Sequence, residues 1–285
     1  MKTIKLSNGI EMPIIGLGVY KIQGDSGQQA ITSAISKYGY RMIDTAQAYL
    51  NEDLVGNAII NSNVNRKDIF ITTKVWFTNY GYNKTIDSIN NSLKKLKTNY
   101  IDLVLLHQPY SDYYSAWRAL EFLYKNRIIK SIGVSNFEPE RLVDLCLNVE
   151  VKPMINQVEL HPFRQRDEEI KWFNKYNVVT QSWGSLGRTN EKIFENPILL
   201  EIAKKHNKTV PQVILGWLTQ NNIVVIPKSV TESRLKDNIN IFDFNLSGDD
   251  INKIKSLNNN ETLFNYYPSD AKTTERIFNL FPELK

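Results

Sequence analysis

The chain has 285 residues, and its hydrophobic fraction of 42% and charged fraction of 23% are typical of folded globular proteins, which excludes disordered and fibrous classes. Cys146 is the only cysteine and the three histidines lack metal-ligand spacing, so we expect no disulfide and no metal site. No apolar run approaches the roughly 18 residues of a membrane span. Because Lys5 and Glu11 interrupt the N-terminal region, we also expect no export signal and a cytoplasmic location.

The formal net charge of +5 and the pI of about 9.0 raise the question of nucleic-acid binding. Lysines and arginines are scattered along the chain, and the densest runs fall within residues 94–97 and 204–205. Short runs of this kind are typical of solvated helix faces, so we expect no nucleic-acid partner. No protein partner is indicated either, because we find no extension or apolar segment suited to one.

The predicted secondary structure begins with a β-hairpin. Residues 5–13 place Asn8-Gly9 between alternating apolar residues, which is the pattern of a type I′ turn. Eight short apolar or β-branched runs are then predicted to be strands, at residues 14–19, 40–44, 68–76, 100–107, 129–135, 154–160, 178–183 and 222–229. Segments with helical spacing lie between strands, among them residues 84–97, 113–126 and 139–147.

The regular alternation of strands and helices predicts the fold class. Most strands start about one βα unit after the preceding strand, and no linker rich in Pro, Gly or Ser divides the chain. Strands that are apolar almost throughout fit a parallel sheet covered by helices. We therefore predict an α/β protein: a single (β/α)8 TIM barrel domain over residues 1–285, with an N-terminal β-hairpin.

Gly16 and Gly18 suggest an alternative, an open doubly wound sheet with a dinucleotide-binding fingerprint. The third glycine of that fingerprint would fall at Lys21, and no helix obviously follows. We therefore interpret the two glycines as letting the first barrel strand turn closely into its loop.

Polar or aromatic side chains stand at the ends of the predicted strands, where (β/α)8 barrels carry their active sites. They are Asp44, Lys74, His107, Ser135, Asn136, Gln157, Trp183, Lys228 and Ser229. Any one of them has an ordinary explanation, such as a helix cap, an exposed lysine or a structural histidine. Because they fall in register at one rim, we predict an active site there.

Tyr49 lies beyond Asp44 in a loop that can reach back over the barrel mouth. A neighbouring Lys74 ammonium would stabilise the phenolate and lower the tyrosine pKa, and Asp44 would hold that ammonium charged. His107 could hydrogen-bond a carbonyl oxygen and orient it toward Tyr49. This set is a proton donor aimed at a developing oxyanion, so the simplest reactant for the carbonyl carbon is a hydride from a nicotinamide.

Over essentially its whole length the chain resembles the aldo-keto reductases. The motifs that carry the resemblance are GIEMPIIGLGV, DTAQAYLNE, TTKVW, LLHQP, IGVSNF, NQVELHP, QSWGSLG and IPKSVTESRLKDN. The resemblance implies a (β/α)8 barrel that reduces aldehydes or ketones to alcohols with NADPH. The catalytic residues it implies are Asp44, Tyr49, Lys74 and His107.

The contacts to NADPH/NADP+ are implied in the same way. Ser135, Asn136 and Gln157 match the residues that bind the nicotinamide carboxamide, and Trp183 would stack on the ring, which suits the chemistry of these side chains. The residues that match the contacts to the 2′-phosphate and the adenine are Lys228, Ser229, Arg234 and Asn238.

The predicted phosphate site also has support from the residues themselves. A helix is expected to begin near Thr231 or Glu232, and its free N–H groups, together with Arg234 in its first turn or so, favour a phosphate. We therefore expect a strong preference for NADPH over NADH. The alternative is that Arg234 only pairs with Asp237 or Glu232 on the helix surface.

The sequence departs from better-known family members around the substrate. Trp183 stands where many members have tyrosine, and in this respect the motif style is closest to bacterial diketogluconate and methylglyoxal reductase-like members, although Ser185 replaces the usual proline. The predicted substrate pocket consists of Tyr20, Trp76, Phe77 and Gln108, of which Tyr20 and Gln108 replace common tryptophans. Short stretches after Trp183 and after Phe264 suggest an open pocket, so we expect small aldehydes or dicarbonyls as substrates.

Two other functions remain open for such a barrel. The first is an NADPH-binding regulatory or scaffolding barrel with little turnover, as some family relatives are, and it is compatible with an intact catalytic set. The second is a sugar-phosphate isomerase or an aldolase, which would require a Schiff-base lysine, for which Lys74 is the candidate, or a paired acid and base. Asp44 beside Lys74 argues against the second, because it would keep the amine protonated.

Overall fold

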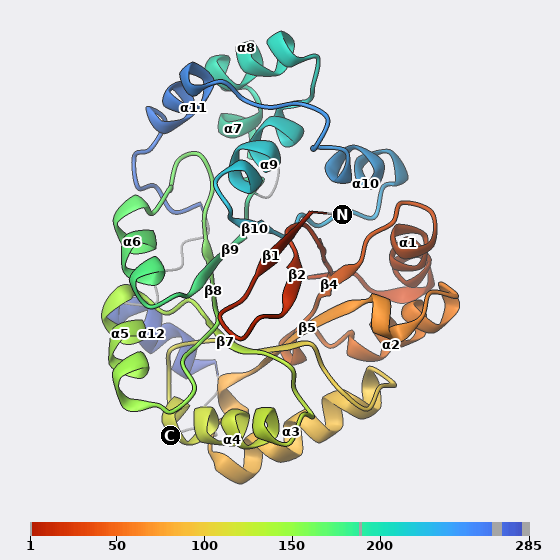
Figure 1. Ribbon diagram of the computed structural model, residues 1–285, viewed down its shortest axis with the longest axis vertical. Helices are drawn as coiled ribbons and strands as arrows, with labels where there is room; N and C mark the ends of the chain where they lie inside the picture. Colours follow the sequence, from red (N-terminus) through yellow and green to blue (C-terminus); the bar gives the residue numbers. More distant parts are fainter. Residues whose placement is uncertain (1, 188–189, 264–269, 281–285) are drawn as a thin grey trace.

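The computed structural model describes residues 2–187, 190–263 and 270–280, and its centre is a barrel of eight parallel strands (Figure 1). The strands are β3 (Leu17–Gly18), β4 (Met42–Asp44), β5 (Phe70–Val75), β6 (Leu103–Leu106), β7 (Ile132–Ser135), β8 (Ile155–Glu159), β9 (Val179–Trp183) and β10 (Val224–Val225). They follow one another around the sheet in chain order, and each lies within one of the predicted runs. The (β/α)8 prediction is therefore confirmed.

The first and last strands of the sheet meet and close the barrel. A parallel bridge pairs Ile15 with Val225, and the Gly16 N–H donates to the Val225 carbonyl at 2.9 Å. A Cβ atom on Gly18 would stand only 2.6 Å from the carbonyl oxygen of Ile226. Glycine at position 18 thus permits the close approach of β3 to the end of β10, which is a more specific role than the turn into a loop that the sequence suggested.

The predicted N-terminal hairpin is confirmed, but its turn differs from the prediction. Strands β1 (Thr3–Lys5) and β2 (Glu11–Pro13) pair antiparallel. Gly9 has a φ of 89°, whereas Asn8 is not among the described residues with positive φ, so a type I′ turn is excluded. The Asn8 side chain instead donates to the Lys130 carbonyl at 3.0 Å, just before β7 begins, which places the hairpin at the amino ends of the barrel strands.

Helices surround the barrel on the outside (Figure 1). They are α1 (Gly24–Ser36), α2 (Glu52–Asn61), α3 (Tyr82–Lys95), α4 (Tyr113–Lys125), α5 (Pro139–Asn148), α6 (Asp167–Lys175), α7 (Glu191–Phe194), α8 (Pro197–His206), α9 (Val210–Gln220), α10 (Glu232–Ile239), α11 (Gly248–Lys255) and α12 (Ala271–Asn279). Short 3-10 helices also lie in the loops, namely η1 (Gln47–Tyr49), η2 (Arg66–Asp68) and η3 (Phe77–Asn79). The three helices expected from periodicity correspond to α3, α4 and α5.

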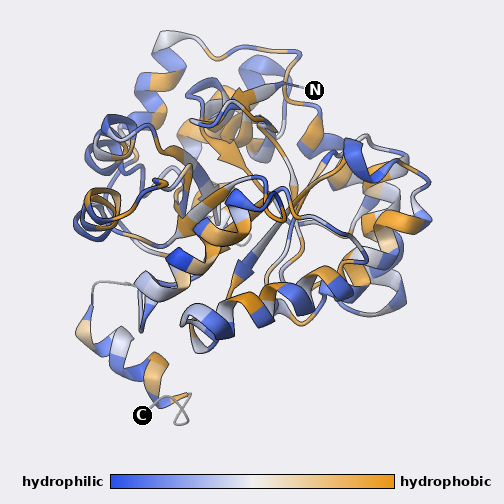
Figure 2. Cartoon of the chain, turned by 60° about the horizontal axis from the view of Figure 1, so that its bottom comes forward, coloured by the Kyte–Doolittle hydropathy of each residue, from blue (hydrophilic) through white to orange (hydrophobic). Residues whose placement is uncertain are grey.

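The hydrophobic core follows from the position of the strands, which lie between the barrel interior and the outer helices. All four residues of β6 are buried, because one face of the strand meets the barrel interior and the other meets the helices. Figure 2 shows the outer helices alternating between hydrophobic and hydrophilic residues, as expected when one face is buried and the other is exposed. Among the described residues, no helix combines the length and the apolar composition needed to cross a membrane.

Candidate active site

An ion pair between neighbouring strands lies at the centre of the site. Asp44 ends β4, and Lys74 lies on β5, which pairs with β4. The Lys74 Nζ donates to Asp44 Oδ1 at 2.5 Å, to the Thr45 carbonyl at 2.9 Å and to Tyr49 Oη at 3.3 Å. The Lys74 side chain is fully buried, so its ammonium is held by these three oxygens.

The electrostatics of the pair hold two protons in place. Burial alone would lower the pKa of Lys74, but the Asp44 carboxylate and Tyr49 outweigh burial and raise it above its ordinary value. Burial also raises the pKa of Tyr49, and the Lys74 ammonium only partly offsets this effect. The expectation of a lowered tyrosine pKa is therefore wrong for the net shift, although Lys74 acts in the expected direction. The phenol stays protonated and the lysine stays charged at neutral pH.

The loop that carries Tyr49 is fixed by side chains that the sequence did not identify. Asn51, which is fully buried, accepts from the Thr45 hydroxyl at 2.7 Å and donates to the carbonyls of Val19 and Ile22 at 2.9 and 3.0 Å. Its amide thus joins the loop after β4 to the loop after β3. The backbone carbonyl of Tyr49 itself accepts from Gln23 Nε2 at 2.9 Å. These contacts hold the phenol over the barrel mouth.

His107 follows β6 directly and faces the same opening. Its ring lies edge-on to Tyr49, with centroids 5.7 Å apart, and edge-on to Trp76 at 5.0 Å. Burial and the Lys74 charge lower the pKa of His107 well below its ordinary value, so the imidazole is neutral. No described residue hydrogen-bonds its Nδ1 atom. A neutral imidazole with one N–H suits the orientation of a carbonyl oxygen.

The predicted nicotinamide ligands lie together on β7, β8 and β9. Ser135 and Gln157 are register partners on β7 and β8, and Asn136 follows Ser135 with a φ of 63°. The Asn136 Nδ2 donates to the His107 carbonyl at 3.1 Å, and its Oδ1 accepts from Trp183 Nε1 at 2.9 Å. Asn136 therefore links the histidine loop to the tryptophan at the end of β9.

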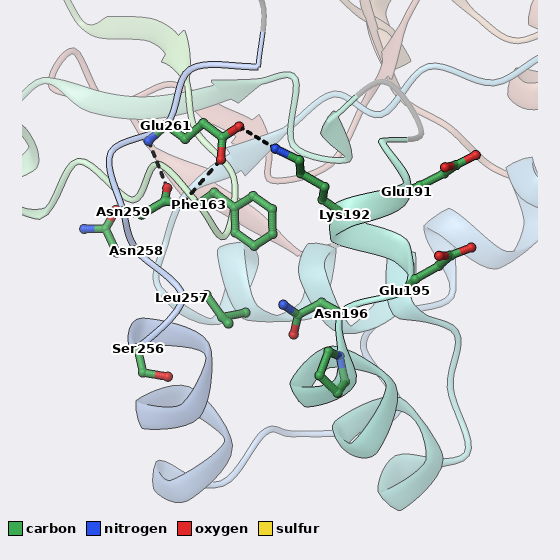
Figure 3. Close-up of a pocket in the computed structure, with 11 residues that line it drawn as sticks. Phe163, Glu191, Lys192, Glu195, Asn196, Ser256, Leu257, Asn258, Asn259 and Glu261 are labelled. Carbon is green, nitrogen blue, oxygen red and sulfur yellow. Dashed lines mark hydrogen bonds and ion pairs between the residues drawn. The ribbon is translucent and has the colours of Figure 1, made fainter.

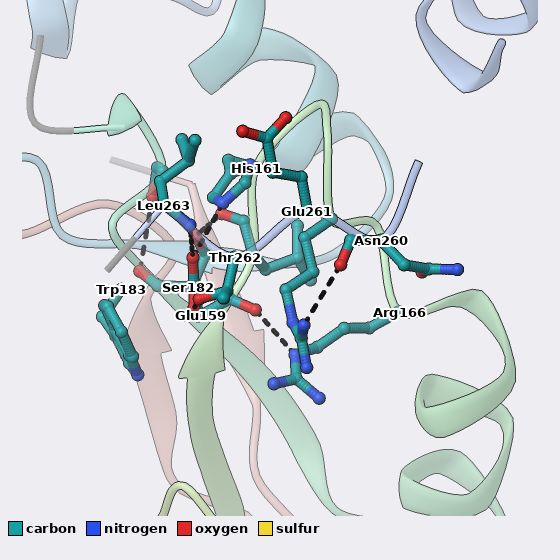
Figure 4. Close-up of polar contacts among 12 residues, drawn as sticks. Glu159, His161, Arg166, Ser182, Trp183, Asn260, Glu261, Thr262 and Leu263 are labelled. Atoms are coloured by element: carbon teal, nitrogen blue, oxygen red, sulfur yellow. Dashed lines mark hydrogen bonds and ion pairs between the residues drawn. The ribbon is translucent and has the colours of Figure 1, made fainter. Parts of the chain in front are cut away.

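A buried polar cluster supports the ends of β8 and β9 (Figure 4). Glu159 accepts from the Thr262 hydroxyl at 2.6 Å and from the Leu263 N–H at 2.9 Å, and it lies 3.0 Å from His161 Nε2. Burial would raise the pKa of Glu159, but these contacts outweigh it and lower the pKa. Arg166, with a φ of 59°, donates to the Glu159 carbonyl at 2.7 Å. The cluster ties the strand carrying Gln157 to the chain leading toward α12.

The predicted phosphate residues lie between β10 and α10, which begins at Glu232 as expected. Lys228 and Arg234 are exposed, whereas Ser229 and Asn238 are buried. Glu232 pairs with Lys37 at 3.2 Å, and within the described ranges no acidic side chain forms an ion pair with Arg234. The alternative in which Arg234 pairs along its own helix is not observed.

The four predicted pocket residues divide into two groups. The ring of Tyr20, 42% exposed, has its centroid 5.0 Å from that of Tyr49, and Trp76 contacts His107, so both border the catalytic set. Phe77 is 1% exposed and packs on Phe278 of α12 at 5.6 Å, which places it in the core behind Trp76. Gln108 is also buried, and its Oε1 accepts from Asn136 at 3.3 Å. Phe264, where one of the two short stretches begins, lies outside the described residues.

A separate hollow of about 740 Å³ lies away from these residues, beside α7, α8 and the segment after α11 (Figure 3). Glu191, Glu195 and Glu261 line it, and Lys192 pairs with Glu261 at 3.2 Å. None of the predicted site residues lines this hollow. Across the parts of the chain that the structure describes, no cluster of three or more His, Cys, Asp or Glu side chains is arranged to hold a metal ion.

Comparison with known proteins gives consistent matches. Residues 15–259 match the family model described as "Aldo/keto reductase family". The chain is 45% identical over 261 residues to "Glyoxal reductase" of Bacillus subtilis (strain 168), covering 91% of this chain and 94% of that protein. It is 40% identical over 263 residues to "Methylglyoxal reductase DkgA" of Escherichia coli (strain K12), again covering 91% and 94%.

A solved structure extends these matches to three dimensions. The aldo-keto reductase of Bombyx mori in complex with NADP superposes with a TM-score of 0.87 at 29% identity, covering 93% of this chain and 95% of that chain. The matched family region runs from before β3 to beyond α11 and includes every residue predicted for the site.

Proposed function

Because this chain belongs to the aldo/keto reductase family, we propose that it reduces small aldehydes and dicarbonyl compounds to alcohols with NADPH, with Tyr49 as the general acid. The observation that carries the proposal is the buried chain of contacts from Asp44 to Lys74 at 2.5 Å and from Lys74 to Tyr49 at 3.3 Å. Family membership supports carbonyl reduction, and this geometry supports Tyr49 as the proton donor.

The residues present fit a nicotinamide dinucleotide. Asn136, Gln157 and Ser135 offer the mixed donors and acceptors that a carboxamide requires, and Trp183 offers a flat aromatic face beside them. When bound, NADPH would supply the hydride that attacks the carbonyl carbon. The solved Bombyx mori relative in complex with NADP supports this choice of cofactor.

The proposed chemistry of the chain's own residues is a single proton transfer. As the carbonyl carbon accepts hydride, the oxygen gains negative charge and takes the proton of the Tyr49 hydroxyl. The Lys74 ammonium, held charged by Asp44, stabilises the phenolate that remains. His107, neutral at working pH, donates a hydrogen bond to the same oxygen and orients it. The phenolate then recovers a proton from solvent.

The preference for NADPH is proposed from the segment before α10. Lys228 and Arg234 supply two exposed positive charges, and Ser229 with the first N–H groups of the helix supplies neutral donors. Glu232, the acidic residue nearest in sequence, is engaged with Lys37 and Tyr38 at 3.2 Å each. A 2′-phosphate therefore meets cations there, which favours NADPH over NADH.

Small substrates are proposed from the walls of the opening and from the relatives. Tyr20 and Trp76 border the catalytic set with aromatic surface. The segment between β9 and α7 runs only from residue 184 to residue 190, which is short for enclosing a substrate. Two relatives at 45% and 40% identity bear the names glyoxal reductase and methylglyoxal reductase. Small aldehydes and dicarbonyls fit both observations.

A cofactor-oxidation assay tests the proposal. The purified protein is mixed with NADPH and a panel of glyoxal, methylglyoxal, benzaldehyde and a steroid ketone, and the loss of NADPH absorbance is followed. We expect the highest kcat/KM for the small compounds. NADPH binding without turnover on any of them would refute the enzyme proposal and favour the regulatory barrel, and preference for the steroid ketone would refute the substrate class.

A further inference from the structure

A row of side-chain hydrogen bonds crosses the barrel interior beneath the proposed nicotinamide site. Gln157 on β8 donates from Nε2 to Asp44 Oδ2 at 2.8 Å and to Gln181 Oε1 on β9 at 3.1 Å. Through Asp44 the row continues to Lys74 and Tyr49. Gln181 is its far end, and neither the family resemblance nor the strand-end pattern identified it.

The chemistry of the partners fixes how the two amides are oriented. The Asp44 carboxylate only accepts hydrogen bonds, so the atom of Gln157 that faces it is the NH2 group. The second N–H of that group points to Gln181, which must therefore present its oxygen. Both hydrogens of Gln157 Nε2 are thus engaged, and its Oε1 is left as an acceptor.

Burial makes this arrangement costly to lose. Gln181 is fully buried and Gln157 is 2% exposed, so bulk water cannot readily take the place of a missing hydrogen-bond partner. Gln157 and Gln181 are register partners on adjacent strands, which holds their side chains side by side. The Nε2 of Gln181 has no hydrogen-bond partner among the described residues. The polar contact that this side chain makes is therefore the one at its Oε1, which accepts from Gln157.

We propose that Gln181 is a positioning residue, which fixes the amide plane of Gln157 so that Gln157 Oε1 meets the carboxamide NH2 of the nicotinamide. This inference rests on the proposed function, in which Gln157 binds that carboxamide. Without the oxygen at position 181, one N–H of Gln157 is unsatisfied and the amide turns about its terminal bond to find another partner. The nicotinamide then loses an oriented acceptor, while the adenine end of the cofactor is unaffected.

Two substitutions separate positioning from simple filling of the core. Gln181→Met keeps the length and the apolar volume but removes the oxygen, whereas Gln181→Glu keeps an oxygen in place whether the acid is ionised or protonated. If Gln181 positions Gln157, the glutamate variant behaves better than the methionine variant. If Gln181 only fills space, the order is reversed, because a buried carboxyl group costs more than a thioether.

The readout is the dissociation constant for two probes, NADPH and adenosine 2′,5′-bisphosphate, which lacks the nicotinamide. We expect Gln181→Met to weaken NADPH binding by roughly tenfold, the loss expected for one unsatisfied buried donor, while bisphosphate binding changes less than about twofold. Gln181→Glu should bind NADPH within about threefold of the unchanged protein. Thr180→Val on the same strand is the matched control, because the Thr180 hydroxyl has no partner among the described residues.

A double substitution adds a second check. In a Gln157→Met background, Gln181→Met should have no further effect on NADPH affinity, since Gln181 acts through Gln157. An additive loss would overturn the proposal, as would unchanged NADPH affinity in Gln181→Met. If Gln181→Met binds neither probe, the Gln181→Glu variant decides. NADPH affinity near that of the unchanged protein supports positioning. A loss of NADPH affinity in this variant, with or without a loss of bisphosphate affinity, overturns the proposal.

The outcome for the unchanged protein separates this inference from the proposed function. An unchanged protein that binds NADPH but reduces no carbonyl compound overturns the enzyme proposal, while the affinities of the variants still test Gln181. An unchanged protein that binds the bisphosphate but not NADPH overturns both.

Discussion

Replacing Asp44 by asparagine probes how the ion pair supports the proton donor. The carboxylate accepts from Lys74 on one oxygen and from Gln157 on the other, at 2.5 and 2.8 Å. An amide has one acceptor and one donor end, so in either orientation an N–H group faces another N–H group. Asp44→Asn therefore removes the charge and also disrupts one of the two hydrogen bonds.

The magnitude follows from the burial of Lys74, whose side chain is fully buried. Removing one partner of a buried ion pair costs about 3–5 kcal/mol in the free energy of unfolding. Without the carboxylate that raises it, the pKa of Lys74 falls, because burial disfavours the charged ammonium. Lys74 then loses its proton at a lower pH than in the unchanged protein, and the phenolate of Tyr49 loses its stabilising charge there.

The pH dependence has a definite sign. Asp44 holds the pKa of Lys74 above its ordinary value of 10.5, so the contribution to stability is fully present below that value and is lost as the pH rises through the folded-state pKa. The difference in unfolding free energy between the unchanged protein and Asp44→Asn is therefore largest below the lowered pKa of Lys74 in the variant, and it shrinks as the pH rises through that pKa and then through the raised pKa in the unchanged protein.

Urea unfolding at several pH values and the pH profile of kcat/KM test this reasoning. The matched control is Asp243→Asn, which breaks the pair of the exposed Asp243 with Lys208 and should change the free energy of unfolding little. In Asp44→Asn we expect the rate to fall with rising pH at a lower pH than in the unchanged protein, because Lys74 deprotonates earlier. A loss no larger than that of the control, with an unchanged pH profile, would refute the role of the ion pair.

Three further outcomes follow from the same geometry. Tyr49→Phe should lower the rate of carbonyl reduction by about 10²-fold or more while NADPH still binds, and near-normal turnover would contradict the assignment of Tyr49 as proton donor. Arg234→Ala should weaken NADPH binding by about 1–3 kcal/mol and leave NADH binding nearly unchanged, whereas equal losses in a fluorescence titration would assign Arg234 to the fold. Burial raises the pKa of Asp250, but hydrogen bonds from Lys205, His206 and Ser247 outweigh it and lower the pKa below its ordinary value of 3.8. Asp250→Asn should therefore destabilise the protein by about 1–3 kcal/mol at pH 7, with a difference that shrinks as the pH falls below about 3.8, and a constant difference in acid urea unfolding would show that the charge is irrelevant.

The sequence was sufficient for features that depend on local pattern. Short apolar or β-branched runs between helical segments located every barrel strand, because a strand buried on both faces has few polar positions. The Asp44 and Lys74 contact was also predictable, since both residues lie at or next to the carboxyl ends of neighbouring strands. Their side chains meet at the distance of an ion pair.

The supporting contacts could not be predicted in this way. Asn51 joins two loops that lie about thirty residues apart in the chain, and Gln181 matters only because β9 pairs with β8 in one particular register. Neither residue breaks a sequence pattern, so no local signal singles it out. The net pKa shift of Tyr49 was missed for a similar reason: the charge of Lys74 is visible in the sequence, but the degree of burial is a property of the whole fold.

The closure of the barrel has a consequence for cofactor binding. Strands β3 and β10 are only two residues long each, so the seam between them rests on few backbone hydrogen bonds, among them Gly18 N–H to the Pro227 carbonyl at 3.3 Å. The next two residues after Pro227 are Lys228 and Ser229, the proposed phosphate ligands. A dinucleotide bound there would stabilise the closed seam. A ligand that binds only the closed barrel adds its binding free energy to the free energy needed to separate β3 from β10. A joint that rests on few hydrogen bonds is thus one that the proposed cofactor would reinforce.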